Sequence, residues 1–195
     1  MGPAGRKVIT EKLPELIKVK NLDFVIVNGE NAGDRGVGIT KKQADEFFNL
    51  GADVITTGNH IWDEKETMEF ISSEKRLLRP ENLVKGSPGK GYDIFKAKNN
   101  KKVGVLNLMG NIFMKKSENV FLAAKKFINE IKLKRDADFI VVDMHGEITS
   151  EKMAMGYLFD GKATMVVGTH THVPTSDHVI MEKGTAYQTD VGMCG

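Results

Sequence analysis

Seven side chains of this sequence have the chemistry of metal ligands or acid–base groups, and they lie at the ends of four apolar runs. Imidazole, carboxylate and amide groups without any thiolate are typical ligands of Mn, Fe, Zn or a similar divalent ion. Four of the five histidines belong to the set, which chance placement would rarely produce. The set consists of Glu30, Asn31, Asn59, His60, His145, His170 and His172.

Taken one at a time, these residues have plainer explanations. A histidine at the end of a strand is more often a hydrogen-bonded polar residue than a ligand, and His178 is left out of the set on that ground. Asn59 and His60 follow a glycine and are compatible with a turn that caps a helix. His170 and His172 are two residues apart, so an extended backbone would point both to one side. The joint arrangement therefore carries the metal hypothesis.

Glu30 is the carboxylate for which we predict a bridging role between two ions. Two ions ~3.5–4 Å apart need a shared carboxylate or hydroxide, and such a pair clamps an in-line phosphoryl displacement. Glu30 stands at a strand end with another candidate ligand, Asn31, beside it in the same loop. Asp143, two residues before His145, is compatible with orienting a ligand and equally with packing or solvation.

The four apolar runs are predicted to be buried strands. They are nearly continuous and rich in β-branched residues, which is typical of strands that helices cover on both faces, as in a parallel sheet. In open α/β sheets, ligands bind beyond the carboxyl ends of the strands, so the seven side chains should converge. The runs cover residues 22–28, 53–60, 138–145 and 164–172.

Helical and hairpin segments separate these strands, which predicts an α/β fold of mixed sheets covered by helices. Pro14 should kink or break the first helix near Leu13, and Thr40 should cap the second. We expect residues 1–195 to form a single domain without repeats or linkers. The predicted helices cover residues 4–20, 40–51, 65–73, 119–134 and 150–159, and the predicted hairpins cover residues 92–109, turning at Asn99-Asn100, and 178–190, turning at Lys183-Gly184.

Composition excludes several classes of protein. Of the 195 residues, 41% are hydrophobic and 28% are charged, which is ordinary for a soluble globular protein. A net charge of +2 and the lack of an aromatic platform argue against a stable nucleic-acid complex. The sequence has no apolar run of membrane-spanning length and no secretory signal, so we expect a cytoplasmic protein without a membrane partner. The single cysteine, Cys194, excludes an intramolecular disulfide and is expected to be buried.

Several motifs resemble those of the calcineurin-like metallophosphoesterases. They are Gly58-Asn59-His60, the later His145 and Gly168-Thr169-His170-Thr171-His172. Within that superfamily, Asn28-Gly29-Glu30-Asn31 is similar to the YmdB-type branch, in which a Glu-Asn pair replaces the more usual aspartate. The segments RLLRPEN, PGKGY, LNLMGNIFM and GTAYQTDVGM also resemble that branch, so the resemblance covers nearly the whole chain.

The resemblance implies a four-layer α/β/β/α sandwich and phosphodiesterase activity, with 2′,3′-cyclic nucleotides as the known substrate class. It also implies two divalent metal ions, whose identity (Fe, Mn, Zn or Mg) the sequence leaves open. Glu30 would bridge the ions, and His60 would donate a proton to the leaving oxygen without binding metal. The remaining ligands would be Asn59, His145 and His170 for one ion, and Asn31 and His172 for the other.

The resemblance departs from the branch at both ends of the chain. Members begin with a buried strand that ends in Gly-Asp, whose aspartate ligates the first ion, whereas this sequence begins at Met1-Gly2-Pro3. Members also continue beyond the Asp-Val-Gly-Met segment, whereas this sequence ends at Gly195. We therefore expect a sandwich that lacks its first strand and a first metal shell that is one carboxylate short.

The sequence is compatible with three hypotheses about function. The first is a two-metal phosphodiesterase in which a metal-bound hydroxide attacks phosphorus in line and His60 is the general acid. The second is a catalytically weakened protein that binds metal or nucleotide in a regulatory or scaffold role. The third is a phosphomonoesterase that resembles 5′-nucleotidases. The partner of an active enzyme would be a small nucleotide or phosphodiester, and a homo-oligomer is compatible with the sequence.

Overall fold

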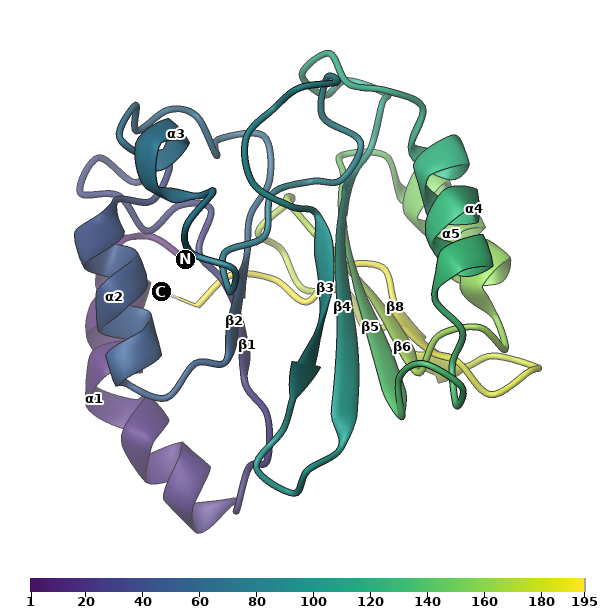
Figure 1. Cartoon of the computed structure of the whole chain (residues 1–195), viewed down its shortest axis with the longest axis horizontal. Coiled ribbons are helices and arrows are strands. Elements are labelled where there is room, and N and C mark those ends of the chain that lie inside the picture. Colours follow the sequence, from purple (N-terminus) through teal and green to yellow (C-terminus); the bar gives the residue numbers. More distant parts are fainter. Residues whose placement is uncertain (195) are drawn as a thin grey trace.

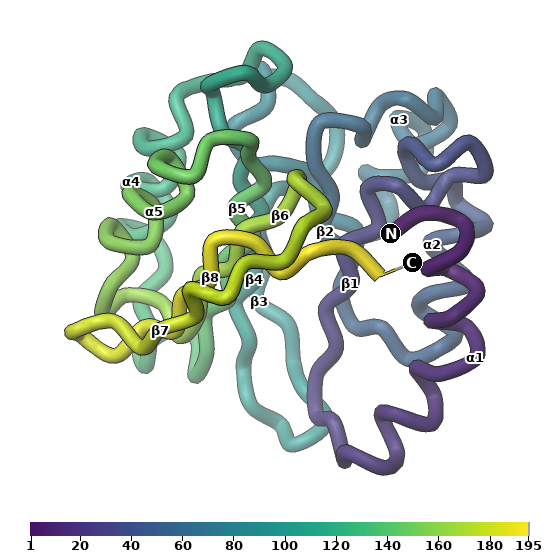
Figure 2. The backbone as a smooth tube through the Cα atoms, turned by 180° about the vertical axis from the view of Figure 1, so that it is seen from behind, coloured from purple at the N-terminus to yellow at the C-terminus, as the bar shows by residue number. Residues whose placement is uncertain are grey.

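The structure, a computed structural model, describes residues 1–194. The helices are α1 (Pro3–Val19), α2 (Lys41–Asn49), α3 (Thr67–Phe70), α4 (Val120–Glu130) and α5 (Thr149–Phe159). The strands are β1 (Ile26–Asn28), β2 (Val54–Thr56), β3 (Tyr92–Lys96), β4 (Lys102–Met109), β5 (Phe139–His145), β6 (Met165–Thr169), β7 (Val179–Ile180) and β8 (Ala186–Gln188). After β8 the chain runs back past β1 and reaches the first turn of α1 (Figure 2).

These elements form four layers (Figure 1). The parallel strands β1 and β2 form a small sheet, and the other six strands form a larger sheet in the order β3-β4-β5-β6-β8-β7. Helices α1 to α3 lie outside the small sheet, whereas α4 and α5 lie outside the larger one (Figure 1). Side chains from both sheets, including Val54 and Val105, share one hydrophobic cluster between them. The predicted α/β/β/α sandwich is therefore confirmed.

The larger sheet follows from the apolar runs. Strands β4, β5, β6 and β8 are parallel to one another, and β4 is buried along its whole length after Lys102. One face of this sheet packs against α4 and α5 through Phe127 and Phe159, and the other packs against the small sheet. Both predicted hairpins are present, as the antiparallel pairs β3–β4 and β7–β8.

Helix α1 continues through Pro14, so the predicted break near Leu13 is wrong. Proline removes one backbone hydrogen bond from a helix. However, Ile9, Leu13 and Ile17, which lie on both sides of Pro14, pack into the same hydrophobic cluster. That shared core stabilises both halves of α1 as one continuous helix.

Helix α4 ends at Glu130, four residues earlier than predicted. The side chain of Asp136 accepts the backbone N–H of Lys132 at 2.8 Å, and Lys134 has a left-handed φ of 68°. A short polar side chain that captures a backbone N–H competes with the helix. Cys194, expected to be buried, is instead exposed near the end of the chain.

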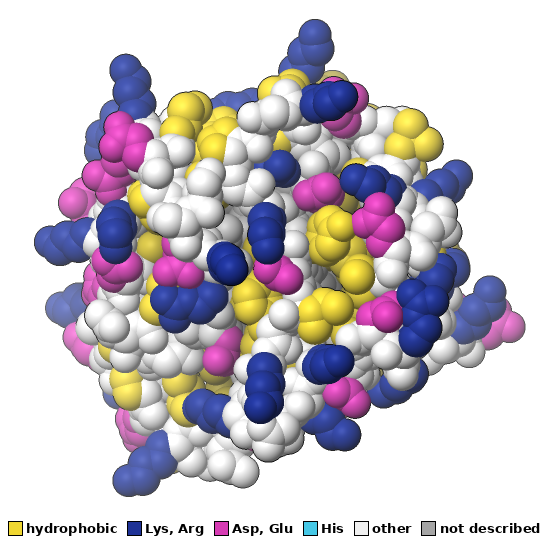
Figure 3. Space-filling view, in the orientation of Figure 1, with side chains coloured by type: hydrophobic (Ala, Val, Ile, Leu, Met, Phe, Trp, Pro, Cys, Tyr) yellow, Lys and Arg dark blue, Asp and Glu magenta, His cyan; other side chains and the backbone are white. Residues whose placement is uncertain are grey.

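Two surface observations bear on possible partners. Within the described residues, no helix is both long and apolar enough to cross a membrane. On the face drawn in Figure 3, basic and acidic side chains are interspersed, and hydrophobic side chains gather near the middle. This face therefore carries no broad basic surface of the kind that binds a nucleic-acid backbone.

Candidate metal centre

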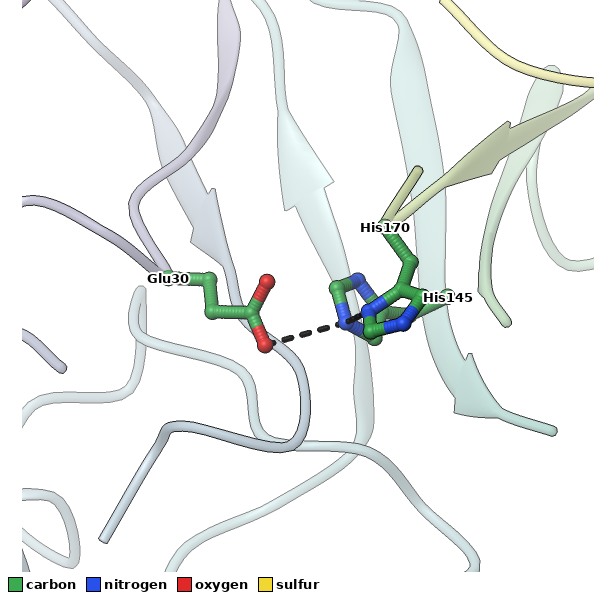
Figure 4. Close-up of side chains that lie close together, drawn as sticks. All are labelled: Glu30, His145 and His170. Carbon is green, nitrogen blue, oxygen red and sulfur yellow. Dashed lines mark hydrogen bonds and ion pairs between the residues drawn. The ribbon is translucent and has the colours of Figure 1, made fainter. Parts of the chain in front are cut away.

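The carboxyl ends of four strands, two from each sheet, bring the predicted ligands together. Glu30 follows β1, Asn59 follows β2, His145 is the last residue of β5 and His170 follows β6. Figure 4 shows Glu30, His145 and His170 pointing toward one another from these separate elements. The convergence predicted for the strand ends therefore occurs for these four residues.

The Nε2 atom of His145 is the centre of this group. It lies 2.9 Å from Glu30 Oε1, 2.9 Å from Asn59 Oδ1 and 3.1 Å from His170 Nδ1. One imidazole proton cannot satisfy three such neighbours, whereas a cation among them would satisfy all four. With metal–ligand distances of ~2.1 Å, adjacent ligands of an octahedral ion lie ~3.0 Å apart. The donor atoms therefore fit a divalent metal ion.

The surroundings of two members of this group favour the protonation states that bind metal. Burial alone would raise the pKa of Glu30, but His145 and the backbone N–H of His60 outweigh it and lower that pKa to about 2. Burial lowers the pKa of His170, and the charge of His145 lowers it further. An ionised carboxylate and a neutral imidazole are the forms that coordinate metal ions.

Asp143 lies directly behind this group and orients it. Its Oδ1 accepts a hydrogen bond from Thr169 Oγ1 at 2.6 Å, and Thr169 Oγ1 lies 3.0 Å from Nδ1 of His145. Its Oδ2 accepts from Thr56 Oγ1 at 2.6 Å and from Asn28 Nδ2 at 3.0 Å. Burial raises the pKa of Asp143. Of the two interpretations open from the sequence, the contacts support the orienting one, because Asp143 links all four strand ends.

The backbone at His170 and His172 is not extended. The prediction that an extended backbone points both side chains to one side is therefore wrong. Their φ angles are 103° and 66°, and β6 ends at Thr169, just before the turn. Asp190 Oδ2 accepts from Thr171 Oγ1 at 2.8 Å and from Thr171 N at 3.2 Å. Lys152 Nζ lies 2.9 Å from the same oxygen. This buried ion pair holds the turn in its left-handed conformation.

Asn31 and His172 lie outside the group centred on His145 but line the same cavity as Glu30 and His170. The cavity has a volume of about 340 Å³. Asn31 donates its amide N–H to Gly36 O at 2.9 Å, so its amide oxygen is the atom left to bind a cation. His172 is exposed. The structure thus places the second predicted ligand pair beside the first group without a direct contact to it.

A second cavity, of about 560 Å³, lies between β1 and the larger sheet. Its lining is mainly apolar, with Phe24, Val105 and Val141 among the contributing residues. Because Glu30 and His170 line the smaller cavity, we place the functional site there despite the greater size of the apolar one.

His60 lies beside the ligands, and its ring contacts the side chain of Asp63. Its backbone N–H donates to Glu30 Oε1 at 3.1 Å, and its Nδ1 lies 2.6 Å from Asp63 Oδ2. Lys115 Nζ lies 2.9 Å from the other oxygen of Asp63. Burial would raise the pKa of Asp63, but the hydrogen bonds from Lys115 and His60 lower it. The side chain of His60 is 32% exposed, so substrate can approach it.

Sequence reasoning missed Asp63, Lys115, Thr169 and the pair of Lys152 and Asp190. Asp63 follows His60 by three residues, a spacing that places two side chains on one side of a helical turn and could have been noticed. The others come from distant segments, and no local pattern relates them to the site.

Comparison with known proteins decides the family. A family model described as YmdB-like protein matches residues 1–195. This chain belongs to the YmdB-like family. The 2′,3′-cyclic-nucleotide 2′-phosphodiesterase of Bacillus subtilis is 46% identical to it over 195 residues, which cover 100% of this chain and 72% of that protein.

Solved structures agree with the YmdB-like assignment. A phosphatase from Mycoplasma pneumoniae superposes with a TM-score of 0.89 at 39% identity, over 100% of this chain and 69% of that one. The sulfate thiohydrolase SoxB of Thermus thermophilus superposes with a TM-score of 0.59 at 13% identity, over 96% of this chain and 38% of that one, which shows the fold alone. The resemblance stated from the sequence is confirmed, and this YmdB-like chain is a hydrolase of the metallophosphoesterase type.

Proposed function

We propose that this protein is a metal-dependent phosphodiesterase whose substrates are 2′,3′-cyclic nucleotides or related small phosphodiesters. The observation that carries the proposal is the convergence of Glu30, Asn59 and His170 on Nε2 of His145. The substrate class is supported by the name of the Bacillus subtilis relative, a 2′,3′-cyclic-nucleotide 2′-phosphodiesterase.

Two ions would be held by ligands that share Glu30. One would be bound by Glu30, Asn59, His145 and His170, because the donor atoms of the other three lie within 3.1 Å of His145 Nε2. The other would be bound by Glu30, Asn31 and His172 across the adjoining cavity. When bound, the ions neutralise charge on the phosphoryl oxygens and lower the pKa of a coordinated water.

His60 would donate the proton that the leaving ribose oxygen needs. Asp63 holds Nδ1 of the ring, so Nε2 is the nitrogen that faces the substrate. The carboxylate of Asp63 fixes the orientation of the imidazole. The hydrogen bond from His60 N to Glu30 keeps the proton donor beside the metal ligands. General acid catalysis of this kind contributes ~10²–10⁴-fold to the rate.

Substrate comparison and one variant test this proposal. Adenosine 2′,3′-cyclic phosphate and bis(4-nitrophenyl) phosphate should be hydrolysed far faster than 4-nitrophenyl phosphate. His60→Ala should lower kcat for the cyclic nucleotide by ~10²–10⁴-fold while metal content is unchanged. If His60→Ala kept the kcat of the parent protein, His60 would not be the general acid. Faster hydrolysis of the monoester would favour a phosphomonoesterase, the activity suggested by the name of the Mycoplasma pneumoniae phosphatase.

A metal-binding regulatory protein with weakened catalysis is the second candidate. It is favoured by the exposure of His172, because an exposed imidazole holds a second ion less firmly than the buried group around His145. Metal analysis separates the two functions. Close to two ions per chain supports the enzyme, and one ion or none supports the regulatory protein.

A further inference from the structure

The loop that joins β4 to α4 begins beside the metal centre and is held there. Gly110 N donates to the backbone oxygen of His145 at 2.8 Å. The carboxylate of Glu151 accepts the N–H of Asn111 at 2.9 Å and that of Ile112 at 3.5 Å. A Cβ atom on Gly110 would lie 2.4 Å from Glu151 Oε2, so a larger residue would displace the carboxylate that accepts the N–H of Asn111. The start of the loop is therefore fixed relative to His145.

The end of the loop is tied back to its start. Asn111 Nδ2 donates to Ser117 Oγ and to Glu118 O, both at 2.9 Å, and its Oδ1 accepts from Val120 N at 2.9 Å. Asn82, which is buried, also donates to Glu118 O at 3.0 Å. These bonds close the loop into a ring, and residues 112–116 form its tip.

Phe113 lies at this tip. Neither burial of its side chain nor the backbone preference of phenylalanine explains its conformation. Its side chain is 84% exposed, and its φ is 59°. The left-handed region costs a non-glycine residue ~1–2 kcal/mol and is an outlier for a bulky side chain. An exposed ring gains no hydrophobic stabilisation in return. Strained residues that the surrounding structure holds in place occur preferentially at binding sites and active sites.

The tip lies at the rim of the site. Lys115, two residues after Phe113, is 2.9 Å from Asp63, and Asp63 holds the ring of His60. Gly110, three residues before Phe113, is bonded to the backbone of His145. Phe113 is thus flanked along the chain by one residue tied to the proton donor and one tied to the central metal ligand. Figure 1 shows the loop crossing the upper end of the larger sheet, between β4 and α4.

We propose that Phe113 is the residue on which the base of a nucleotide substrate stacks. This inference rests on the proposed function and narrows its substrate class to phosphodiesters that carry a nucleobase. Stacking of a base on an aromatic ring is worth ~1–3 kcal/mol and tolerates every base, because each base has a flat face. A loop already clamped at both ends presents the ring without a further ordering cost. The enzyme should therefore favour nucleotides over baseless diesters and discriminate weakly among bases.

Kinetics with matched substrates test the proposal. Phe113→Ala should raise KM for adenosine 2′,3′-cyclic phosphate about ten-fold, which corresponds to ~1.4 kcal/mol of stacking, and leave kcat nearly unchanged. KM for glycerol 1,2-cyclic phosphate, which has no base, should not change. Phe113→Trp should retain the KM of the parent protein. The control is Tyr157→Ala, which removes a 70% exposed ring from α5, on the far side of the larger sheet.

A binding measurement separates failure of this proposal from failure of the proposed function. The fluorescence of 2-aminopurine riboside 3′-phosphate should be quenched on binding to the parent protein and to Tyr157→Ala, and much less on binding to Phe113→Ala. This readout does not need turnover, so it holds even for a protein that hydrolyses nothing. Equal quenching by the parent protein and Phe113→Ala would overturn the proposal. The proposal would also be overturned if Phe113→Ala changed only the oligomeric state measured by sedimentation and left quenching and KM unchanged. Phe113 would then be a contact between copies of this chain.

Discussion

The residues around His145 and those around His60 occupy the same end of the two sheets, but their surroundings differ. His145 and Glu30 are buried, and the imidazole of His145 lies within hydrogen-bond distance of Thr169 Oγ1 and Asn59 Oδ1. Thr169 in turn donates to Asp143. By contrast, the side chain of His60 is 32% exposed. It is held by Asp63, which in turn pairs with the exposed Lys115.

The difference in burial suits the two regions to different functions. A buried set of charged and polar atoms is stable only if its members pair with one another or with a cation. The group around His145 is therefore suited to binding an ion permanently. A partly exposed histidine held by a carboxylate can instead approach the substrate directly. Changes in the first region should affect metal binding, and changes in the second should affect turnover alone.

The largest effect is expected for His145→Ala. The variant removes the atom that three other ligands surround, so metal affinity should fall by more than the ~10–100-fold typical of an outer-shell partner. Phosphodiester hydrolysis should fall with it. Competition with a chelating dye measures the affinity, and His178→Ala, an exposed histidine outside the set, is the control. If His145→Ala kept the metal affinity of the parent protein, the group around His145 could not be the metal-binding region.

Asp143→Asn should have the next largest effect. The amide has the shape of the carboxylate but cannot accept from Thr56, Thr169 and Asn28 at the same time. We expect ~10–100-fold weaker metal binding and a loss of ~1–3 kcal/mol in the free energy of unfolding. Chelator competition and urea denaturation measure the two quantities. Asp45→Asn, on the surface of α2, is the control and should change neither metal affinity nor stability. If Asp143→Asn lowered stability and left metal affinity unchanged, Asp143 would have a structural role only.

Asp63→Asn changes the region around His60 and leaves the ligands around His145 intact. An amide hydrogen-bonds Nδ1 of His60 less strongly than a carboxylate and orients the ring less firmly, so kcat should fall about ten-fold, less than the ~10²–10⁴-fold effect of losing a general acid. Metal content should equal that of the parent protein. Steady-state kinetics and metal analysis of the same sample check both points. Loss of metal in this variant would mean that His60 and Asp63 belong to the ligand set.

The smallest effect is expected for Lys115→Ala. The ion pair of Lys115 with Asp63 is partly exposed, and such pairs are worth ~0–1 kcal/mol. The change in kcat/KM should therefore stay below about five-fold and shrink further as salt is added. An effect as large as that of Asp63→Asn, at low and high salt alike, would give Lys115 a direct role with the substrate.

Much of this arrangement could be predicted from the sequence. The apolar runs specified the buried strands because both faces of the larger sheet are covered, and polar residues at the ends of those runs therefore met at one edge. The identity of the ligands followed from their chemistry. The YmdB-like resemblance then supplied the layers and the proposed pairing of ligands with ions.

Other features depended on tertiary contacts that no local pattern contains. The turn at His170 and His172 is left-handed because Asp190, eighteen or more residues away, holds Thr171. Thr169 gave no signal, since a threonine in an apolar strand is usually ordinary β-structure. Pro14 misled the prediction, because local preference favoured a break while packing on both sides of it favoured one helix.

Anomalous diffraction from crystals grown with Mn²⁺ would show whether a metal ion binds at the group around His145. We expect a peak bounded by Glu30 Oε1, Asn59 Oδ1, His145 Nε2 and His170 Nδ1, at ~2.0–2.3 Å from each. A second and weaker peak should lie toward Asn31 and His172. Absence of the first peak in crystals that hold Mn²⁺ elsewhere, or a peak that persists unchanged in His145→Ala, would contradict the assignment of this group as a metal centre.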